Sequence, residues 1–172
     1  MISRMMRAAS LDSHLYEEVE ADSSAILQAL LIVILVSIVR GISTLTEVDN
    51  ALSGIGIGVV GGLISWSVWA FITYIIGVKL LPTEATNSSW GELARVTGFA
   101  QTPGLLFILV LVPVVGQYLA LPVLLWQLFA MVVGIRQALD YTSTLRAVSV
   151  VLIGFVVVII IQYMLFALVG GA

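Results

Sequence analysis

Residues 147–169 read AVSVVLIGFVVVIIIQYMLFALV and contain no Asp, Glu, Lys or Arg. A helix needs about 20 consecutive apolar residues to cross a hydrocarbon core of roughly 30 Å. An ionised side chain at the centre of a bilayer costs several kcal/mol, so such runs avoid charge. This stretch therefore predicts a transmembrane helix.

Four more stretches of the chain pass the same length test, and the whole sequence is 60% hydrophobic and only 10% charged. The third stretch is the most polar, because Glu92, Arg95, Gln101 and Pro103 interrupt it, and we expect it to be kinked or partly interfacial. The sequence predicts an all-α, polytopic membrane helix bundle with five transmembrane helices at 24–42, 52–78, 90–112, 118–135 and 147–169.

The segment before the first span is short and acidic. Leu11, Leu15, Tyr16 and Val19 recur at helical spacing among glutamates, which predicts a short amphipathic helix that packs on the protein. No apolar run with a cleavage site follows the first two arginines, so we expect no signal peptide. The predicted organisation is a short cytoplasmic N-terminal segment, 1–22, and a five-helix transmembrane domain, 23–172.

The distribution of basic residues predicts the orientation in the membrane. Only Arg40 falls on one side of the predicted spans, whereas six bases fall on the other side: Arg4, Arg7, Lys79, Arg95, Arg136 and Arg146. Basic residues favour the cytoplasmic side. We therefore expect a cytoplasmic N-terminus and, after five crossings, an extracytoplasmic C-terminus.

Glycines in the second span match two patterns. Gly56, Gly58 and Gly61 fit the G-x-G-x-x-G dinucleotide fingerprint, but no strand precedes them and the apolar run continues beyond them. Gly54, Gly58 and Gly62 recur every four residues, which places three positions without side chains on one helix face. This spacing favours close helix packing, either within the chain or against a second copy.

Charged residues near the span ends are the other candidate site. Glu92 and Arg95 are three residues apart, and Arg136 and Asp140 are four apart, so each pair is predicted to share a helix face. Arg146 adds a base before the fifth span. Snorkelling and pairing at the interface explain such residues without a further role. The alternative is contact with a lipid head group or partner, with Arg95, Arg136, Asp140 and Arg146 as the candidate residues.

Residues for catalysis or metal binding are scarce. The chain has no cysteine and a single histidine, His14, so it lacks a transition-metal ligand set. The acidic residues before the first span lack the spacing of a calcium loop. We expect no enzymatic activity, no catalytic residue, no metal and no cofactor.

Several stretches together resemble a known family. They are WGELARVTGFAQTPGLL at 90–106, PVVG at 113–116, a helix centred on Trp126 and IRQALDYTSTLRA at 135–147, with the acidic YEEVEAD at 16–22. This combination resembles prokaryotic members of the YIP (Ypt/Rab-interacting protein) family. The resemblance implies five spans and a cytoplasmic N-terminus. Eukaryotic relatives are associated with Rab-type GTPases through long N-terminal regions, and a segment of about 22 residues does not favour that role.

Three functions remain as hypotheses from the sequence. The first is a non-enzymatic membrane scaffold or accessory subunit in the plasma membrane of a prokaryote, with lipids and other membrane subunits, or a second copy, as partners and no nucleic acid. The second is a small transporter or channel, favoured by the broken appearance of 101–104. The third is an intramembrane enzyme, which the absence of any catalytic spacing makes the weakest.

Overall fold

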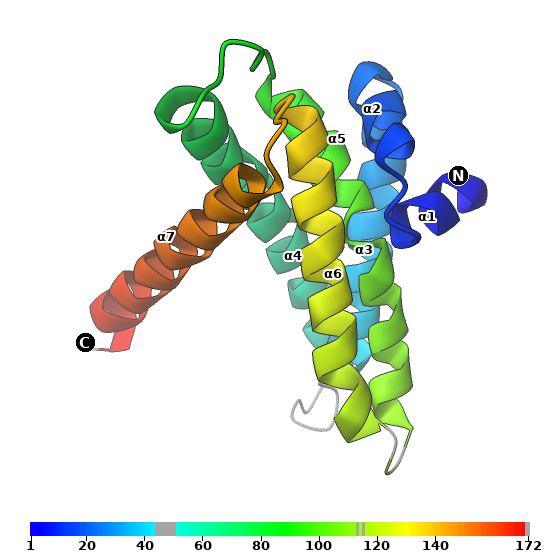
Figure 1. Ribbon diagram of the computed structural model, residues 1–172. Coiled ribbons are helices and arrows are strands. Elements are labelled where there is room, and N and C mark those ends of the chain that lie inside the picture. The colour runs from blue at the N-terminus through cyan, green and yellow to red at the C-terminus, as the bar shows by residue number, and fades with distance from the viewer. Residues whose placement is uncertain (44–50, 113, 115, 171–172) are drawn as a thin grey trace.

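The computed structural model describes residues 1–43, 51–112, 114 and 116–170 (Figure 1). Within these ranges the regular structure is helical, without strands. A π-helical segment, η2 (Ile75–Leu80), extends the fourth helix, and a 3-10 segment, η3 (Thr102–Leu111), follows the fifth. The α-helices are α1 (Ile2–Ala9), α2 (Ser13–Ala21), α3 (Ala25–Ser43), α4 (Ala51–Tyr74), α5 (Trp90–Phe99), α6 (Gly116–Ala138) and α7 (Thr144–Gly170).

Five helical stretches are long and apolar enough to cross a membrane, which confirms the predicted fold class. They are Ala25–Ile42, Ile55–Leu80, Trp90–Leu111, Tyr118–Ala138 and Thr144–Met164. The N-terminal segment differs from expectation, because it forms two short helices, α1 and α2, instead of one. Leu11 lies between them with φ 62°, a left-handed conformation that turns the chain sharply.

The third span changes helix type partway across. Ser89 and Glu92 form a reciprocal capping box that begins α5, and α5 ends at Phe99. Pro103 follows, and its ring is incompatible with a continuous α-helix. The chain continues as η3, and the Thr102 hydroxyl donates to the Phe99 carbonyl at 2.7 Å. The interruption predicted from the sequence is therefore a change from α-helix to 3-10 helix.

The core lies where α2, α3, α5 and α6 meet. Small residues allow the close crossings: a Cβ at Gly98 would lie 2.7 Å from that of Ala29, and one at Gly134 would lie 2.7 Å from Val96. The largest completely buried side chains include Tyr16, Phe99, Leu15, Ile32, Leu93 and Ile135. Because α2 supplies two of these, the N-terminal segment is part of the core.

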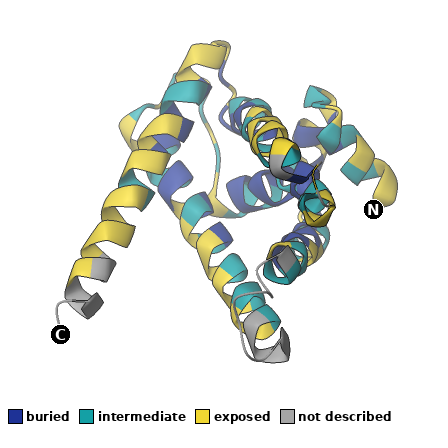
Figure 2. Cartoon of the chain, turned by 90° about the horizontal axis from the view of Figure 1, so that it is seen from below, coloured by how far each residue is buried: buried dark blue, intermediate teal, exposed yellow. Residues whose placement is uncertain are grey.

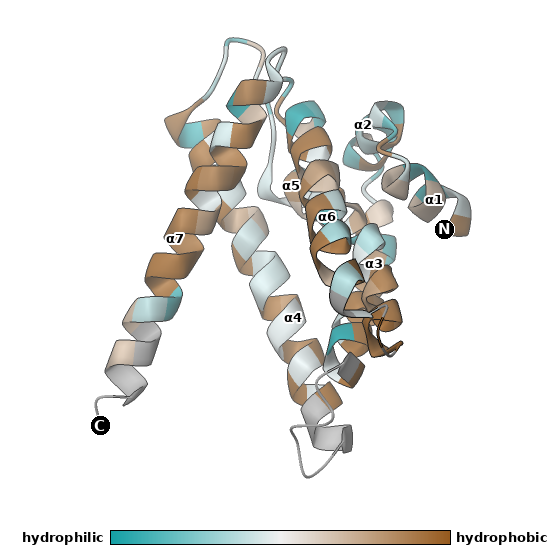
Figure 3. Cartoon of the chain, turned by 60° about the horizontal axis from the view of Figure 1, so that its bottom comes forward, coloured by the Kyte–Doolittle hydropathy of each residue, from teal (hydrophilic) through white to brown (hydrophobic). Residues whose placement is uncertain are grey.

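The last span, α7, departs from this bundle (Figures 1 and 3). It packs beside α4, α6 and η2 near its N-terminal end and diverges from them toward its C-terminal end. Most of its described surface beyond the junction is exposed (Figure 2). A predominantly apolar helix with little protein cover needs lipid or another helix around it.

Charged groups gather at one end of the bundle, where α2, the start of α5 and the end of α6 meet. We call this region the charged end and define it by Glu20, Glu92, Arg95, Arg136 and Asp140. The connection between η2 and α5 lies at the same end, and α7 runs away from it toward the opposite end (Figure 1).

Candidate functional site

Arg95 is the central residue of the charged end. The Ser89–Glu92 capping box fixes the first turn of α5, and Arg95 follows one turn later. Its Nε donates to the carbonyl oxygen of Val19 at 2.9 Å, and its Nη2 donates to the carbonyl oxygen of Glu20. These carbonyls belong to the last turn of α2, whose oxygens have no partner within their own helix. Arg95 thus binds the C-terminal end of α2 to α5.

Glu20 sits half-buried beside this contact. Burial and, to a lesser extent, the negative charges of Asp140 and Glu92 raise the pKa of its carboxyl to about 7, although the positive charge of Arg95 acts to lower it. The Glu20 carboxyl therefore holds its proton into the neutral range. The charged end therefore places a carboxyl with a raised pKa beside the contact between α2 and α5.

Arg136 serves the corner between α6 and α7. Its Nε donates to the carbonyl oxygen of Tyr141 at 3.1 Å, and its Nη2 donates to that of Thr142 at 3.3 Å. The helix ends at Ala138, and Asp140 has φ 51°, which turns the chain out of the helical register. The guanidinium therefore binds the backbone of the turn between α6 and α7 and stabilises this turn.

The two ion pairs expected from helical spacing do not form among the described residues. Glu92 accepts from the Ser89 backbone in the capping box, and Arg95 is engaged by α2. Asp140 has left the helical register, so four-residue spacing no longer brings it to Arg136. These charged side chains bind backbone groups at helix ends instead of one another, because unpaired terminal amides and carbonyls are costly near a membrane.

Arg146 contacts a different segment again. Its Nη1 lies 3.4 Å from the carbonyl oxygen of Pro82, and its guanidinium lies 5.7 Å from the ring centre of Tyr141. The Tyr141 hydroxyl donates to the carbonyls of Gly77 and Leu81, at 3.0 and 2.7 Å, and so closes the end of η2. The candidate arginines of the third, fourth and fifth spans thus support three separate backbone segments.

The glycine face of α4 lies against α3 of the same chain. A Cβ at Gly62 would lie 2.9 Å from the Cβ of Ser37 and would overlap its hydroxyl. At Gly58 the nearest atoms are the Gly41 Cα and the Ser37 carbonyl oxygen, both at 3.9 Å. Gly54 lies in α4, but its surroundings fall outside the described residues. The tightest approach in the described part of this face is therefore at Gly62.

The pairs that the sequence did not indicate connect α1 with α2. Arg4 pairs with Glu18 at 2.7 Å and Asp22 at 2.9 Å, and Arg7 pairs with Asp12 and Glu18, both at 2.7 Å. These hydrogen bonds hold the pKa of the Glu18 carboxyl below its usual range, with Arg7 the larger cause. The sequence does contain a signal for these pairs: Arg4 and Arg7 are three residues apart, and acidic residues follow in the next helix.

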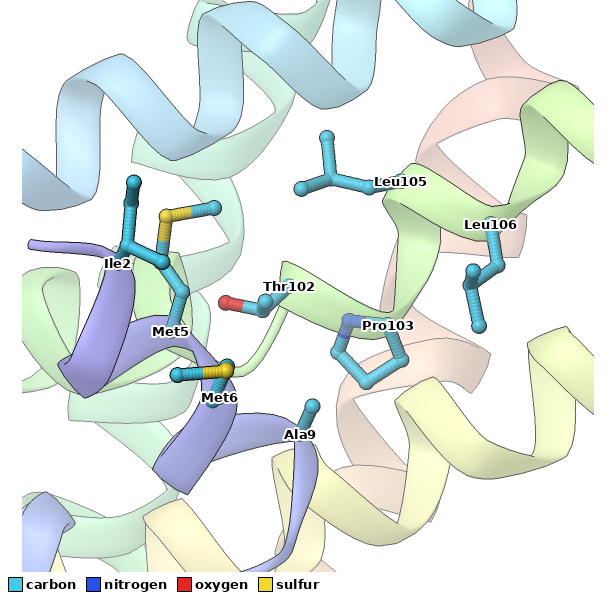
Figure 4. A pocket seen from close by; sticks show the side chains of 8 residues that line it. All are labelled: Ile2, Met5, Met6, Ala9, Thr102, Pro103, Leu105 and Leu106. Carbon is cyan, nitrogen blue, oxygen red and sulfur yellow. The ribbon is translucent and has the colours of Figure 1, made fainter.

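A groove opens between α1 and η3 (Figure 4). It has a volume of about 270 Å³ and is lined by Ile2, Met5, Met6, Ala9, Thr102, Pro103, Leu105 and Leu106. The only hydroxyl in this lining, that of Thr102, already donates to Phe99. The groove can therefore accept an apolar group but offers no free side-chain donor.

Within the described residues, no group of three or more His, Asp or Glu side chains is placed to hold a metal ion. The fold and its charged end define the class: a multi-pass α-helical membrane protein with five apolar spans. The chain belongs to the Yip1 domain family, whose pattern matches residues 13–166, from α2 into α7. This match confirms the resemblance seen in the sequence. No curated protein and no solved structure matches the chain.

Proposed function

We propose that this protein is a non-enzymatic membrane scaffold or accessory subunit, and that α4 and α7 form the surface that receives another membrane helix. The supporting observation is the divergence of α7 from the bundle (Figure 3). At the junction, the Trp69 ring lies 4.9 Å from that of Phe155, and a Cβ at Gly154 would lie 3.1 Å from Trp69. The two helices separate beyond this contact.

The surfaces that flank the separation are apolar and exposed. On α7, Val156, Ile159, Ile160 and Met164 are all more than half exposed, in the span 144–164. On α4, the face turned away from α3 includes Ile57, Val60 and Ile64, and nothing lies within 4 Å of a Cβ built at Gly56 or Gly61. Both helices therefore have surface left for van der Waals packing.

Packing of this kind drives helix association in a bilayer. Lipid tails are as apolar as the helices, so the association depends on close contact and small residues rather than on burial from water. Gly56 and Gly61 each leave open space beside α4, where a second backbone can approach. We propose other membrane-protein subunits or a second copy of the chain as the occupant, with membrane lipids covering the remaining surface.

The orientation proposed from the basic residues accords with the arrangement of the helices. Arg95, Arg136 and Arg146 lie toward the charged end, with α2, whereas α7 ends at the opposite end (Figure 1). We propose that the charged end is cytoplasmic, that the C-terminus is extracytoplasmic, and that the membrane is the plasma membrane of a prokaryote. Reporter fusions at the two termini test this orientation, and two termini on one side would overturn it.

Photo-crosslinking tests the scaffold proposal directly. A photoreactive residue at Ile160, which is 52% exposed, should join α7 to a second polypeptide in native membranes, whereas the same residue at Val150, which is 1% exposed, should react within the chain. Mass spectrometry of the product distinguishes a second copy from a different subunit. Labelling of lipid alone at Ile160 would contradict the proposal.

A specific observation favours a transporter or channel as the second candidate. The third span changes helix type at Thr102, and the Arg40 guanidinium donates to Gln127 Oε1 at 2.8 Å between two spans. The Arg40 guanidinium also lies 5.0 Å from the ring centre of Phe107. Irregular helices and charges inside a membrane mark transport paths in many proteins. Ion or solute flux in proteoliposomes above that of empty liposomes would favour this candidate over the scaffold.

A further inference from the structure

Helix α1 exposes large apolar side chains and turns its arginines toward the protein, which is the opposite of a helix that faces water. Ile2 and Met6 are 74% and 62% exposed, and Met1 is also exposed. The arginines turn the other way, because Arg4 and Arg7 are both engaged by acids of α2 or its flanking turns. The outer surface of α1 is therefore mostly apolar, with Ser3 as an exposed polar side chain, and the charges of its two arginines are paired with acids of the protein.

The depth of α1 can be measured along the neighbouring spans. The carbonyl oxygen of Ala9 accepts from Trp126 Nε1 at 2.7 Å, and Thr102 lines the groove beside α1. Thr102 follows Arg95 by seven residues and Trp126 precedes Arg136 by ten, which is roughly 10–15 Å at about 1.5 Å per residue. Amphipathic helices in membranes lie about 5–10 Å inside the head-group boundary. Helix α1 therefore packs beside the apolar part of the third and fourth spans, away from the level of Arg95 and Arg136.

The carbonyl groups at the end of α1 have the partners that this depth requires. The Ala8 oxygen accepts from the Tyr16 hydroxyl at 3.1 Å, and the Ala9 oxygen accepts from Trp126. The Arg7 oxygen accepts from the Asp12 amide at 3.1 Å, and the Met6 oxygen accepts from the Ser10 amide. No water is available in hydrocarbon, so these groups must be satisfied within the protein.

We propose that α1 lies in the lipid leaflet at the charged end, and that the groove between α1 and η3 holds an acyl chain of a membrane lipid. Figure 4 shows the apolar side chains of Met5, Met6 and Leu105 around the groove. Methionine side chains adapt to irregular apolar partners. The groove has no free hydroxyl or charged side chain for a head group, so the hydrocarbon portion is the part of the lipid it suits. This inference requires the membrane spans and is independent of a partner for α7.

Single-cysteine variants test the position of α1, because the natural chain has no cysteine. Met6→Cys and His14→Cys are compared in phosphatidylcholine nanodiscs; His14 on α2 has a side chain that is 84% exposed. Charged thiol reagents are excluded from hydrocarbon, so we expect Met6→Cys to react at least about tenfold more slowly than His14→Cys. Equal rates would place α1 in water and overturn the proposal.

Photolabelling tests the groove itself. Vesicles of phosphatidylcholine with a trace of the same lipid carrying a diazirine on its acyl chain should label both residues 1–9 and residues 102–106. Two variants narrow the groove from opposite walls: Ala9→Leu on α1 and Leu106→Phe on η3. Each should remove most labelling from 102–106, whereas labelling of Ile2 should persist. Absence of label from residues 1–9, or unchanged labelling of 102–106 in both variants, would overturn the proposal.

Discussion

Arg95 of α5 donates a hydrogen bond from Nε to the carbonyl oxygen of Val19, and this contact fastens the last turn of α2 to the third span. The same guanidinium reaches the carbonyl of Glu20. One side chain therefore replaces the partners that two terminal carbonyls of α2 would otherwise take from water. Between α2 and α5, the contact is made by an arginine that binds backbone carbonyls rather than by a pair of opposite charges.

Replacing Arg95 should loosen α2. We expect Arg95→Ala to lower the free energy of unfolding by about 1.5–3 kcal/mol, because hydrogen bonds from a charged group are lost and carbonyls lose their partner. Thermal unfolding in nanodiscs and limited proteolysis near Asp22 measure the effect. Arg146→Ala is the matched control, since Arg146 makes one long, exposed hydrogen bond to Pro82 and lies 5.7 Å from the ring centre of Tyr141. Equal losses in the two variants would contradict a special role for Arg95.

The protonation of Glu20 should make the attachment of α2 sensitive to pH. The pKa of Glu20 in the folded protein is raised to about 7 from 4.5, so the folded state favours the protonated form. Its stabilising contribution is complete below pH 4.5 and is lost as the pH rises through about 7. Because Glu20 is only half-buried, solvent screening reduces the effect to the order of 1 kcal/mol.

Substitution of Glu20 separates this effect from other titrations. Glu20→Gln should be more stable than the natural chain at pH 8 and should flatten the change in melting temperature between pH 5 and pH 8. Asp140, Glu92, Glu17 and Arg95 also act on this carboxyl and remain in the variant. Glu84→Gln, in the exposed connection before α5, is the control and should leave the pH profile as it was. An identical profile in Glu20→Gln would refute the assignment.

The spans and their apolar character followed from the sequence, because a bilayer imposes length and hydropathy on every crossing helix. The interruption of the third span, a change from α-helix to 3-10 helix, followed from Pro103. Two features of the N-terminal segment did not follow. The turn at Leu11 depends on a left-handed residue that is not glycine, and the Arg4–Glu18 pair joins two helices whose relative placement only the fold determines.

The candidate site was harder to predict for a physical reason. Helical spacing places Arg136 and Asp140 on one face only while the helix continues, and α6 ends at Ala138. Spacing within one helix also cannot predict whether an arginine binds an acid on the same helix or the carbonyls of a distant helix. Arg95 binds the carbonyls of α2. The glycine pattern predicted a packing face, but only the crossing with α3 identifies Gly62 as its tightest described point.

Bulk at Gly62 should separate α3 from α4. We expect Gly62→Leu to destabilise the protein by about 1–3 kcal/mol, the usual cost of overpacking, because Ser37 occupies the space that a Cβ would take. Gly61→Leu adds the same side chain one residue earlier, where nothing lies within 4 Å, and should leave the melting temperature nearly unchanged. If both variants melt together, helix propensity and not packing controls this part of α4.

The hydroxyl of Tyr141 should be needed to close η2. It donates to the carbonyls of Gly77 and Leu81, which end a π-helical segment whose terminal oxygens have no partner in the helix itself. Tyr141→Phe keeps the buried ring and removes only the donor, so we expect a loss of about 1–3 kcal/mol from the unsatisfied carbonyls. Tyr163→Phe removes a hydroxyl from a residue that is 73% exposed on α7 and should change the melting temperature little.

Hydrogen exchange localises the effect, because faster exchange confined to 77–81 distinguishes opening of η2 from general unfolding. Unaltered exchange at 77–81 in Tyr141→Phe would mean that the π-helical segment is closed without this side chain.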